Sequence, residues 1–410
     1  MKPSAFVVAV VISFWSSDSI EVFGQQAIDF PTALELARKN NPDWRAAEQE
    51  VQVARGRLTT AGLISAFNPV IEGQGGPRRM HGEGTGADYG VGISMEVEVA
   101  GQRAARITEA ERNLQKFEAN FQDFARTFRA RLSRAFYQAI VARERLALQR
   151  RVEDLNKSLA DVTKIKFDAG DVSGLEVNVA TVRYGLSRKE TFDAERNLTQ
   201  ALLELRRLVG TDQTYLPEGK LDIAVPMVPA AAILESALAN RPDLRARRYE
   251  LQRAEAELAL IRRQILPNPI FALSFNREGT GDKTVLGGVS IPLPVFNRRQ
   301  GELESLEARR IQARSELLAL EKEIQKEINQ AINQWETARQ SAGLFQREVI
   351  DQIDENFRLI EAAYRERRID LPQLLVMENN LINGNQSYLE VLSSLREAAI
   401  QIEEVTGEVR

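Results

Sequence analysis

Few side chains in this sequence are suited to active-site chemistry. The chain contains no cysteine and a single histidine, His81, which lies in a glycine-rich stretch. Without cysteine, a disulfide, a thiolate metal site and a cysteine nucleophile are excluded. A lone loop histidine is usually a solvated residue, and it offers no paired acid and base for catalysis. We therefore expect no catalytic residue, no metal ligand and no cofactor, and predict that the protein is not an enzyme.

The composition is that of a polar, helix-rich chain without a nucleic-acid surface. Charged residues make up 27% of the 410 residues, and hydrophobic residues make up 43%. The 54 basic and 58 acidic residues are well mixed and give a formal net charge of −4. A nucleic-acid-binding surface would need a basic stripe, which this mixed pattern does not provide. The length indicates more than one domain.

The first residues have the pattern of an export signal. Lys2 precedes an apolar run from Ala5 to Trp15, which is too short to cross a bilayer as a helix. Val22 and Gly24 stand at the small-residue positions that a signal peptidase prefers, so we predict a signal peptide over residues 1–24. No later segment is a long, charge-free apolar helix. The mature protein is then either secreted and soluble or inserted in a membrane as a β-barrel.

The chain contains two copies of one plan. The segment "LELARKNNPDWRAAEQEVQVA" from Leu34 matches "LESALANRPDLRARRYELQRA" from Leu234, a constant offset of 200 residues. Further along, Gly210 aligns with Gly407 at an offset of 197. An offset this steady indicates a duplication rather than a solenoid of short repeats. The two predicted repeats cover residues 25–220 and 221–410.

Each repeat contains two predicted strands followed by a long helical hairpin. The strands are expected at about residues 69–76, 88–99, 269–276 and 284–294, and the hairpins at about 102–210 and 300–407. No glycine or proline interrupts the stretch from Gln102 to Ala169. A continuous helix there would be on the order of 100 Å long, at about 1.5 Å per residue. Such a helix must pack on neighbours, because helix propensity alone does not stabilise it.

Apolar residues alternate with small or polar residues along the predicted strands. Over about ten residues, this alternation is typical of strands that face lipid on one side. The rival interpretation is a soluble β-sandwich with one dry face, but the long helical stretches between the strand pairs make a poor sandwich. The residues predicted to face lipid are Tyr89, Val91, Ile93, Met95, Val97, Phe271, Leu273, Phe275, Val289 and Ile291.

Four strands in one chain are too few to close a membrane barrel. Each unpaired backbone group that faces lipid costs several kcal/mol, and single-chain bacterial barrels begin at about eight strands. Several chains must then share one barrel with cyclic symmetry, and three chains would supply about twelve strands. The predicted fold class is mostly α with a small transmembrane β part: a trimeric, twelve-stranded β-barrel continued by an α-helical barrel.

After the signal segment, the chain resembles the TolC-like outer-membrane efflux family. "FDAGDVSGLEVNVA", from Phe167, looks like the tip of that family's first helical hairpin. "IPLPVFNRRQG", from Ile291, is similar to the strand–helix junction of the CzcC-like, heavy-metal efflux branch. The resemblance implies a homotrimeric channel-tunnel in the outer membrane of a Gram-negative-type cell, with its helical tunnel in the periplasm. It also implies a periplasmic adaptor, an inner-membrane pump and outer-membrane lipid as partners, and no nucleic acid.

The implied function is passive export of small solutes by the outer-membrane component of a tripartite efflux system. The junction favours heavy-metal cations as substrate, and drug efflux and type I secretion are the alternatives within the family. A different class of protein, a secreted coiled-coil scaffold or an adaptor without a pore, is the rival. An adaptor would normally contain a compact β-rich domain between its helices, and this sequence has no such segment.

The resemblance also assigns roles at the two hairpin tips. Tyr364 matches a tyrosine that helps to hold the family's tunnel shut, and Glu176 stands at the position of its acidic partner. Ile369 occupies the family's arginine position, so we hypothesise that Arg367 or Arg368 pairs with Glu176 to close the entrance. The plainer interpretation of these arginines is a solvated helix end, where cations are favourable. The residues expected to contact the adaptor are Phe167, Gly170, Val172, Ser173 and Ile369.

Overall fold

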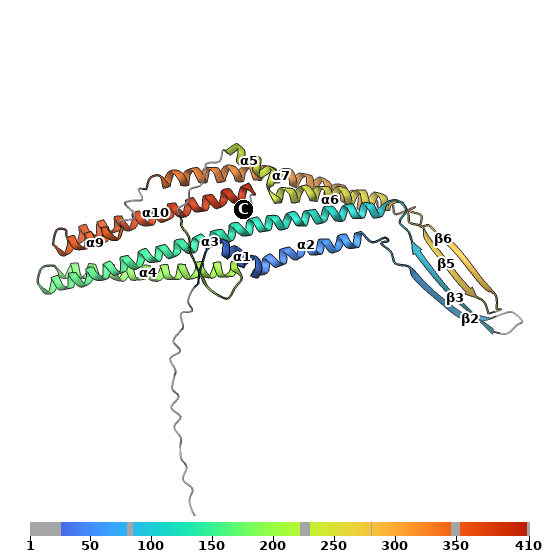
Figure 1. Cartoon of the computed structure of the whole chain (residues 1–410), viewed down its shortest axis with the longest axis horizontal. Coiled ribbons are helices and arrows are strands. Elements are labelled where there is room, and N and C mark those ends of the chain that lie inside the picture. The colour runs from blue at the N-terminus through green and yellow to red at the C-terminus, as the bar shows by residue number, and fades with distance from the viewer. Residues whose placement is uncertain (1–25, 80–84, 222–229, 280, 346–352, 408–410) are drawn as a thin grey trace, which may run out of the picture.

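The protein is an elongated helical bundle with a small sheet at one end (Figure 1). A computed structural model describes residues 26–79, 85–221, 230–279, 281–345 and 353–407. The predicted signal peptide and His81 lie outside these described residues. The turns of the helical hairpins lie at the end opposite to the sheet (Figure 1). The prediction of a mostly helical chain with a small β part is confirmed.

The same order of elements occurs twice along the chain. The first copy consists of α1 (Phe30–Asn40), α2 (Pro42–Ala61), β2 (Val70–Arg79), β3 (Thr85–Glu96), α3 (Gln102–Asp168) and α4 (Gly174–Val209). The second consists of α5 (Ala230–Asn240), α6 (Pro242–Gln264), β5 (Ile270–Arg277), β6 (Lys283–Ser290), α7 (Gln300–Ala342), α9 (Ile353–Arg365) and α10 (Leu371–Thr406). Two short parallel strands, β1 (Gln26–Ile28) and β4 (Tyr215–Pro217), form a separate pair.

The long helices differ between the two copies. α3 runs without a break for 67 residues. Its counterpart α7 ends at Ala342, and the N–H of Gly343 donates to the carbonyl oxygen of Arg339 at 3.1 Å. Glycine is the weakest helix former after proline, which accounts for the break inside the hairpin expected over residues 300–407. Over the described residues, no helix has the length and apolar character needed to cross a membrane.

A buried amide ties the start of α2 to the end of α4. Asn41 Oδ1 accepts the N–H of Asp43 at 2.8 Å, and Asn41 Nδ2 donates to the carbonyl oxygen of Leu208 at 2.9 Å. The equivalent residue of the second copy, Arg241, makes no side-chain cap. Its guanidinium pairs instead with Glu327 at 2.5 Å, which joins α6 to α7. The start of the equivalent helix is therefore held by an amide cap in the first copy and by an ion pair in the second copy.

An aromatic cluster packs beside the Asn41 cap. Trp44 meets Phe121, Phe124 and Phe128 edge-on, with ring centroids 5.5 to 5.9 Å apart. Phe128 is fully buried. Edge-to-face aromatic pairs each contribute about 0.5–1.5 kcal/mol beyond the area they bury. These contacts hold α2 against the middle of α3 and fix the direction in which the chain reaches the sheet.

The four strands of the sheet are antiparallel and lie in the order β2-β3-β5-β6. β3 pairs with β5, so both copies contribute to one sheet. The strands expected at 88–99 and 284–294 end earlier, at Glu96 and Ser290. Pro292, which has no N–H to donate, follows β6 and accounts for the end of pairing there. Val97 and Ile291, both predicted to face lipid, lie beyond the strand ends.

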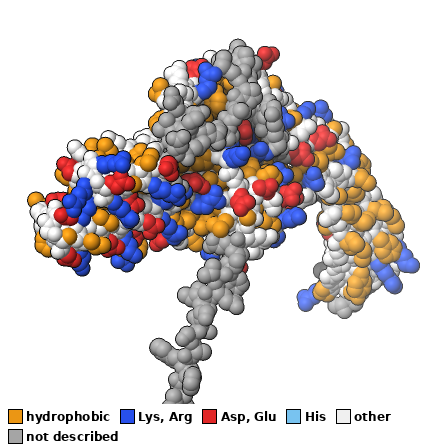
Figure 2. Space-filling view, turned by 60° about the vertical axis from the view of Figure 1, so that its left-hand side comes forward, with side chains coloured by type: hydrophobic (Ala, Val, Ile, Leu, Met, Phe, Trp, Pro, Cys, Tyr) orange, Lys and Arg blue, Asp and Glu red, His pale blue; other side chains and the backbone are white. Residues whose placement is uncertain are grey.

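One face of this sheet is apolar and exposed. The register brings its side chains into three rows across the strands: Met95–Phe271–Val289, Ile71–Ile93–Leu273 and Val91–Phe275–Val285. Apart from the half-buried Met95, these side chains are 45–75% exposed. The opposite face consists mostly of small and polar residues, including Glu72, Gln74, Ser274 and Asn276, with Val70 and Leu286 as apolar exceptions. Figure 2 shows hydrophobic side chains over much of the sheet's visible surface.

Both strand-to-helix junctions are built in the same way. Gln102 and Gln300 each accept the backbone N–H of the residue two positions earlier, at 2.7 and 2.9 Å. The residue before each glutamine is in the left-handed region, Gly101 with φ +73° and Arg299 with φ +58°. An L residue in this conformation is strained by roughly 1–2 kcal/mol, whereas glycine is not. The turn is therefore the same in both copies although the residue types differ.

The left-handed glycine after α4 provides a stability test. Gly210 has φ +75°, and a Cβ built on it would lie 2.7 Å from Asn41 Cα, whereas Gly185, inside α4, has open space around it. We predict that Gly210→Ala lowers the free energy of unfolding by about 1–2 kcal/mol or more, because of strain and this contact. Gly185→Ala should raise it by roughly 0.5–1 kcal/mol. Thermal melts followed by circular dichroism measure both, and shifts of equal sign would contradict the prediction.

Candidate functional site

Both hairpin tips use the same backbone turn. Gly170, after α3, has φ +81°, and Arg367, after α9, has φ +62°. In each turn, the N–H of the following residue donates to the carbonyl oxygen five positions earlier at 2.8 Å. This is the Schellman arrangement, in which glycine usually occupies the left-handed position. An arginine in this position is strained by roughly 1–2 kcal/mol, which glycine avoids. We therefore expect the arginine side chain to make a stabilising contact that glycine could not make.

A capping box begins the second helix of each hairpin. Ser173 accepts the N–H of Glu176, and Asp370 accepts the N–H of Gln373, while each N3 side chain bonds back to the N-cap N–H. Such reciprocal bonds satisfy two backbone donors that a helix start leaves free. Together with the Schellman turns, they make two rigid, equivalent tips.

Charged contacts join the two tips. Arg367 forms an ion pair with Asp171. The Lys166 ammonium donates to the carbonyl oxygen of Tyr364 at 2.7 Å and lies 4.0 Å from the centroid of the Tyr364 ring. Burial lowers the pKa of Lys166, and the positive charge of Arg367 lowers it further. The arginine in the strained turn is thus held by an acid from the other hairpin.

Tyr364 anchors the second tip in the interior. Its side chain is buried, and its hydroxyl lies 3.0 Å from Thr163 Oγ1. Because Thr163 Oγ1 already donates to the carbonyl oxygen of Leu159 at 2.7 Å, Tyr364 is the donor in this pair. The ring packs in an apolar cluster that also contains Leu371 and Leu374. This buried hydroxyl pair links α9 to α3 just behind the exposed ion pair.

The structure differs from the hypothesis that Glu176 pairs with Arg367 or Arg368. Glu176 Oε1 turns back to the N–H of Ser173 at 3.3 Å, because the third position of a helix places a carboxylate over its own cap. Arg368 pairs with Glu366 at 2.7 Å. Within this chain, therefore, neither arginine meets Glu176.

The residues expected to contact an adaptor lie around the two tips. Phe167 is 46% exposed, and Gly170 and Ser173 are exposed at the first turn. Val172 is half-buried, and Ile369 packs against the apolar cluster around Tyr364. Of these five residues, Phe167 is thus the large apolar side chain that is most exposed.

A buried carboxylate behind the tips was not predicted from the sequence. Glu378 in α10 has no exposed surface, and its Oε1 accepts Asn156 Nδ2 at 2.7 Å and lies 3.4 Å from Arg183 Nη2. Its Oε2 and Arg183 Nε are buried without a hydrogen-bond partner among the described residues. Burial raises the pKa of Glu378 above its ordinary value, against the opposing charge of Arg183.

The spacing of apolar residues in α10 contained the signal for this site. Leu371, Leu374 and Ile382 are buried positions of one helix face, and Glu378 falls on the same face between them. A charged residue at a core position of an amphipathic helix usually has a buried partner. The partner could not be predicted from the sequence, since Asn156 and Arg183 are about 200 residues away.

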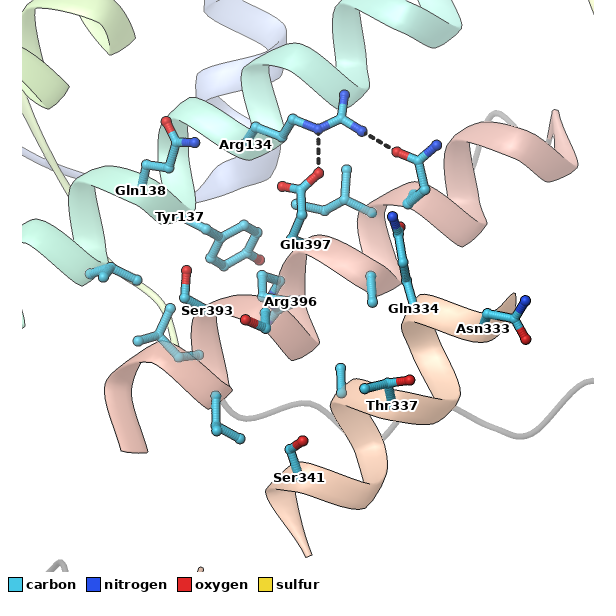
Figure 3. Close-up of a pocket in the computed structure, with 18 of the residues that line it drawn as sticks. Arg134, Tyr137, Gln138, Asn333, Gln334, Thr337, Ser341, Ser393, Arg396 and Glu397 are labelled. Carbon is cyan, nitrogen blue, oxygen red and sulfur yellow. Dashed lines mark hydrogen bonds and ion pairs between the residues drawn. The ribbon is translucent and has the colours of Figure 1, made fainter. Parts of the chain in front are cut away.

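A polar cavity of about 870 Å³ lies between α3, α7 and α10 (Figure 3). Its charged side chains are already engaged: Arg134 donates to Glu397 at 2.7 Å, and Arg396 lies 4.0 Å from the centroid of the Tyr137 ring. Amides and hydroxyls supply much of the remaining lining, including Gln138, Asn333, Gln334, Thr337, Ser341 and Ser393. Across the described residues there is no cluster of three potential metal ligands. The cavity therefore offers polar contacts beside apolar side chains such as Val141 and Ile400.

Comparisons with known proteins identify relatives among outer-membrane efflux proteins. The family model described as "Outer membrane efflux protein" matches residues 33–211 and 233–408. The chain is 27% identical over 405 residues to the cobalt-zinc-cadmium resistance protein CzcC of Cupriavidus metallidurans, covering 97% of this chain and 95% of that one. It is 22% identical over 411 residues to the pyoverdine export outer membrane protein OpmQ of Pseudomonas putida, covering 91% and 84%. The structure of CusC, which forms a transmembrane channel, matches with a TM-score of 0.72 at 18% identity over 92% and 91% of the chains, which shows a shared fold.

Glu378 gives the helical end a defined pH dependence. Its folded pKa is raised above the ordinary value of 4.5, so the folded state binds this proton more tightly than the unfolded state. Protonated Glu378 therefore stabilises the folded state fully below the pKa that this group has in the unfolded chain. The stabilisation is lost as the pH rises through the pKa of Glu378 in the folded state. We predict that the melting temperature of the wild type falls more between about pH 5 and pH 7.5 than that of Glu378→Gln, which keeps an acceptor for Asn156 but cannot titrate.

The matched control for this measurement is Glu355→Gln, at an exposed position of α9. It should retain the wild-type difference in melting temperature between the two pH values. Equal pH dependence in the wild type and Glu378→Gln would contradict the assignment.

Proposed function

The chain belongs to the outer membrane efflux protein family, and from this premise we propose that it is the outer-membrane channel of a tripartite efflux system. The observation that carries the proposal is the exposed apolar face of the sheet, set at one end of a long helical bundle. Exposed apolar patches of this extent mark a surface that lipid or another protein covers. Strands that alternate apolar and polar residues suit a sheet with lipid on one side and water on the other.

We propose that three copies close the sheet. β2 and β6 are its edge strands and have no further strand partner in the described part of the chain. Edge strands in lipid must be paired, since unpaired backbone groups there are costly. Three copies of a four-stranded sheet make twelve strands, which cyclic symmetry closes. The apolar rows then face lipid, and Gln74 and Asn276 face a water-filled lumen.

In this proposal the helices form a tunnel in the periplasm and the hairpin tips point toward the inner membrane. The signal peptide over residues 1–24 directs export and is removed. The tips meet a periplasmic adaptor coupled to an inner-membrane pump, through Phe167, Val172 and the exposed first turn. This orientation is supported by the position of the tips at the end of the molecule opposite to the sheet (Figure 1).

We further propose that contacts between the tips narrow the tunnel entrance. The Asp171–Arg367 ion pair is largely exposed, with 66% of the Arg367 side chain accessible. Exposed pairs are worth about 0–1 kcal/mol, so a docking partner can displace this one readily. Tyr364 and its partner Thr163 hold the second tip behind it. Glu176 and Arg368 lie at the rim, where they meet neighbouring copies.

Heavy-metal cations are the substrate class that we favour. The similarity to the cobalt-zinc-cadmium resistance protein supports it. A chain with no cysteine and one histidine lacks the soft ligands that hold such metals tightly, which suits a passive conduit. Export of a small organic molecule is the second candidate, supported by the similarity to the pyoverdine export protein.

Membrane insertion through the apolar face is tested by a pair of neighbouring substitutions. Leu273 lies in the middle of the three apolar rows, and Ser274 points to the opposite face. A lysine at a lipid-facing position near the bilayer midplane costs about 2–4 kcal/mol. Leu273→Lys should therefore strongly reduce the amount of heat-sensitive trimer in the outer-membrane fraction, while Ser274→Lys should leave it near the wild-type amount. A wild-type protein that remained soluble and monomeric would refute the proposal.

Single-channel recordings in planar bilayers test the gate. Asp171→Asn removes the charge that holds Arg367, so we expect a larger conductance than in the wild type. Asp168→Asn, at a neighbouring exposed position, is the matched control and should leave conductance unchanged. Glu176→Ala in the same assay measures whether this residue also restrains the entrance. Unchanged conductance in both Asp171→Asn and Glu176→Ala would show that these tip residues do not restrict the tunnel entrance.

A further inference from the structure

At the end farthest from the helices, the apolar face of the sheet ends in a row that contains two cations. Arg277 of β5 lies directly opposite Lys283 of β6 and opposite Tyr89 of β3. All three side chains are exposed. They lie on the same face as Val91, Phe275 and Val285, one row further from the helices, which is a displacement of roughly 7 Å along the strands. Figure 2 shows cationic side chains beside the hydrophobic ones at this end of the sheet.

Two cations placed opposite each other on adjacent strands destabilise a sheet unless an anion lies between them. No carboxylate in the described part of the chain forms an ion pair with Arg277 or Lys283. The neighbouring acids point to the other face, since successive strand residues alternate. There Arg78 pairs with Glu278 at 2.5 Å and approaches Asp88 at 3.6 Å. Among the described residues, the cation on the polar face is thus neutralised, whereas the cation pair on the apolar face has no counter-charge.

We propose that Arg277 and Lys283 bind the phosphate of an anionic lipid headgroup in the outer leaflet. The proposal rests on the membrane orientation given above, in which this row is the first beyond the apolar rows. A guanidinium binds phosphate oxygens through two parallel N–H groups, and an ammonium adds a compact charge. Tyr89 supplies an amphipathic ring at the same level, which is where tyrosine is enriched in membrane proteins.

A lipid phosphate fits this row better than a soluble anion. The row opens sideways from the sheet, next to Phe275 and Val285, so a ligand bound there has its apolar part against these side chains. A soluble phosphate would gain only the two charges. Arg79, exposed near the end of β2, is a third cation toward the same end of the sheet. Cations close to an anionic lipid surface each strengthen binding severalfold.

Native mass spectrometry of the full-length protein in neutral detergent, titrated with diphosphoryl lipid A, tests the site. The test variant carries Arg277→Gln and Lys283→Gln, and the control carries Arg314→Gln and Lys322→Gln, two exposed cations of α7. We expect the test variant to bind lipid A at least about tenfold more weakly than the wild type and the control. The test variant should still fold, because it removes a repulsion.

Further measurements distinguish a lipid phosphate from a soluble anion as the ligand of this row. Inorganic phosphate at millimolar concentration should not displace lipid A, and displacement would overturn the lipid assignment in favour of a soluble anion. Equal lipid affinity in the wild type and the test variant would overturn the site itself. Flotation with liposomes and single-channel conductance are measured on the same samples. If the test variant loses lipid A binding but still floats with liposomes and conducts ions, the lipid site is separate from the channel function. A wild-type protein that neither floats with liposomes nor conducts ions contradicts the proposed function.

Discussion

The four-stranded sheet exposes an apolar face that a single chain cannot cover. Burial of apolar surface contributes about 25 cal/mol per Å². Side chains such as Phe271 and Leu273 are about half exposed in a single chain, so about half of that contribution is not made. Lipid would cover the face but would leave the two edge strands unpaired, which the bilayer interior does not tolerate. In the proposed assembly, further copies of the chain meet both requirements, because they pair the edge strands and close the sheet.

The duplicated plan preserves backbone geometry more strictly than side-chain chemistry. Left-handed residues recur at equivalent places, Gly101 with Arg299 and Gly170 with Arg367. At both pairs the second copy keeps the turn with an arginine, although the conformation is strained by roughly 1–2 kcal/mol. In the tip, the arginine makes an ion pair with the other hairpin, a contact that glycine could not make. The second copy thus carries charged side chains in turns whose backbone conformation is the same in both copies.

The helical end combines weak exposed links with strong buried ones. The Asp171–Arg367 pair is open to solvent and can be broken at little cost. Behind it, Tyr364 and Glu378 are buried among α3, α9 and α10, where breaking a polar contact leaves an unpaired group in an apolar cluster. A partner that separates the outermost turns would therefore leave the inner packing of the hairpins intact, which limits the movement to the tips.

Local features could be predicted from the residues alone: the mostly helical fold, the duplication, the alternating strand faces and the positions of both hairpin tips. These depend on periodicity and on cap and turn residues within a few positions of each other. Three tertiary contacts could not be predicted in this way: Arg367 meets Asp171 rather than Glu176, Glu378 lies buried beside Asn156, and Arg277 lies opposite Lys283. Those contacts join segments that a strand register or a helix packing brings together, often from about 200 residues away. Sliding one element by a single residue would replace every partner, and no local pattern records that choice.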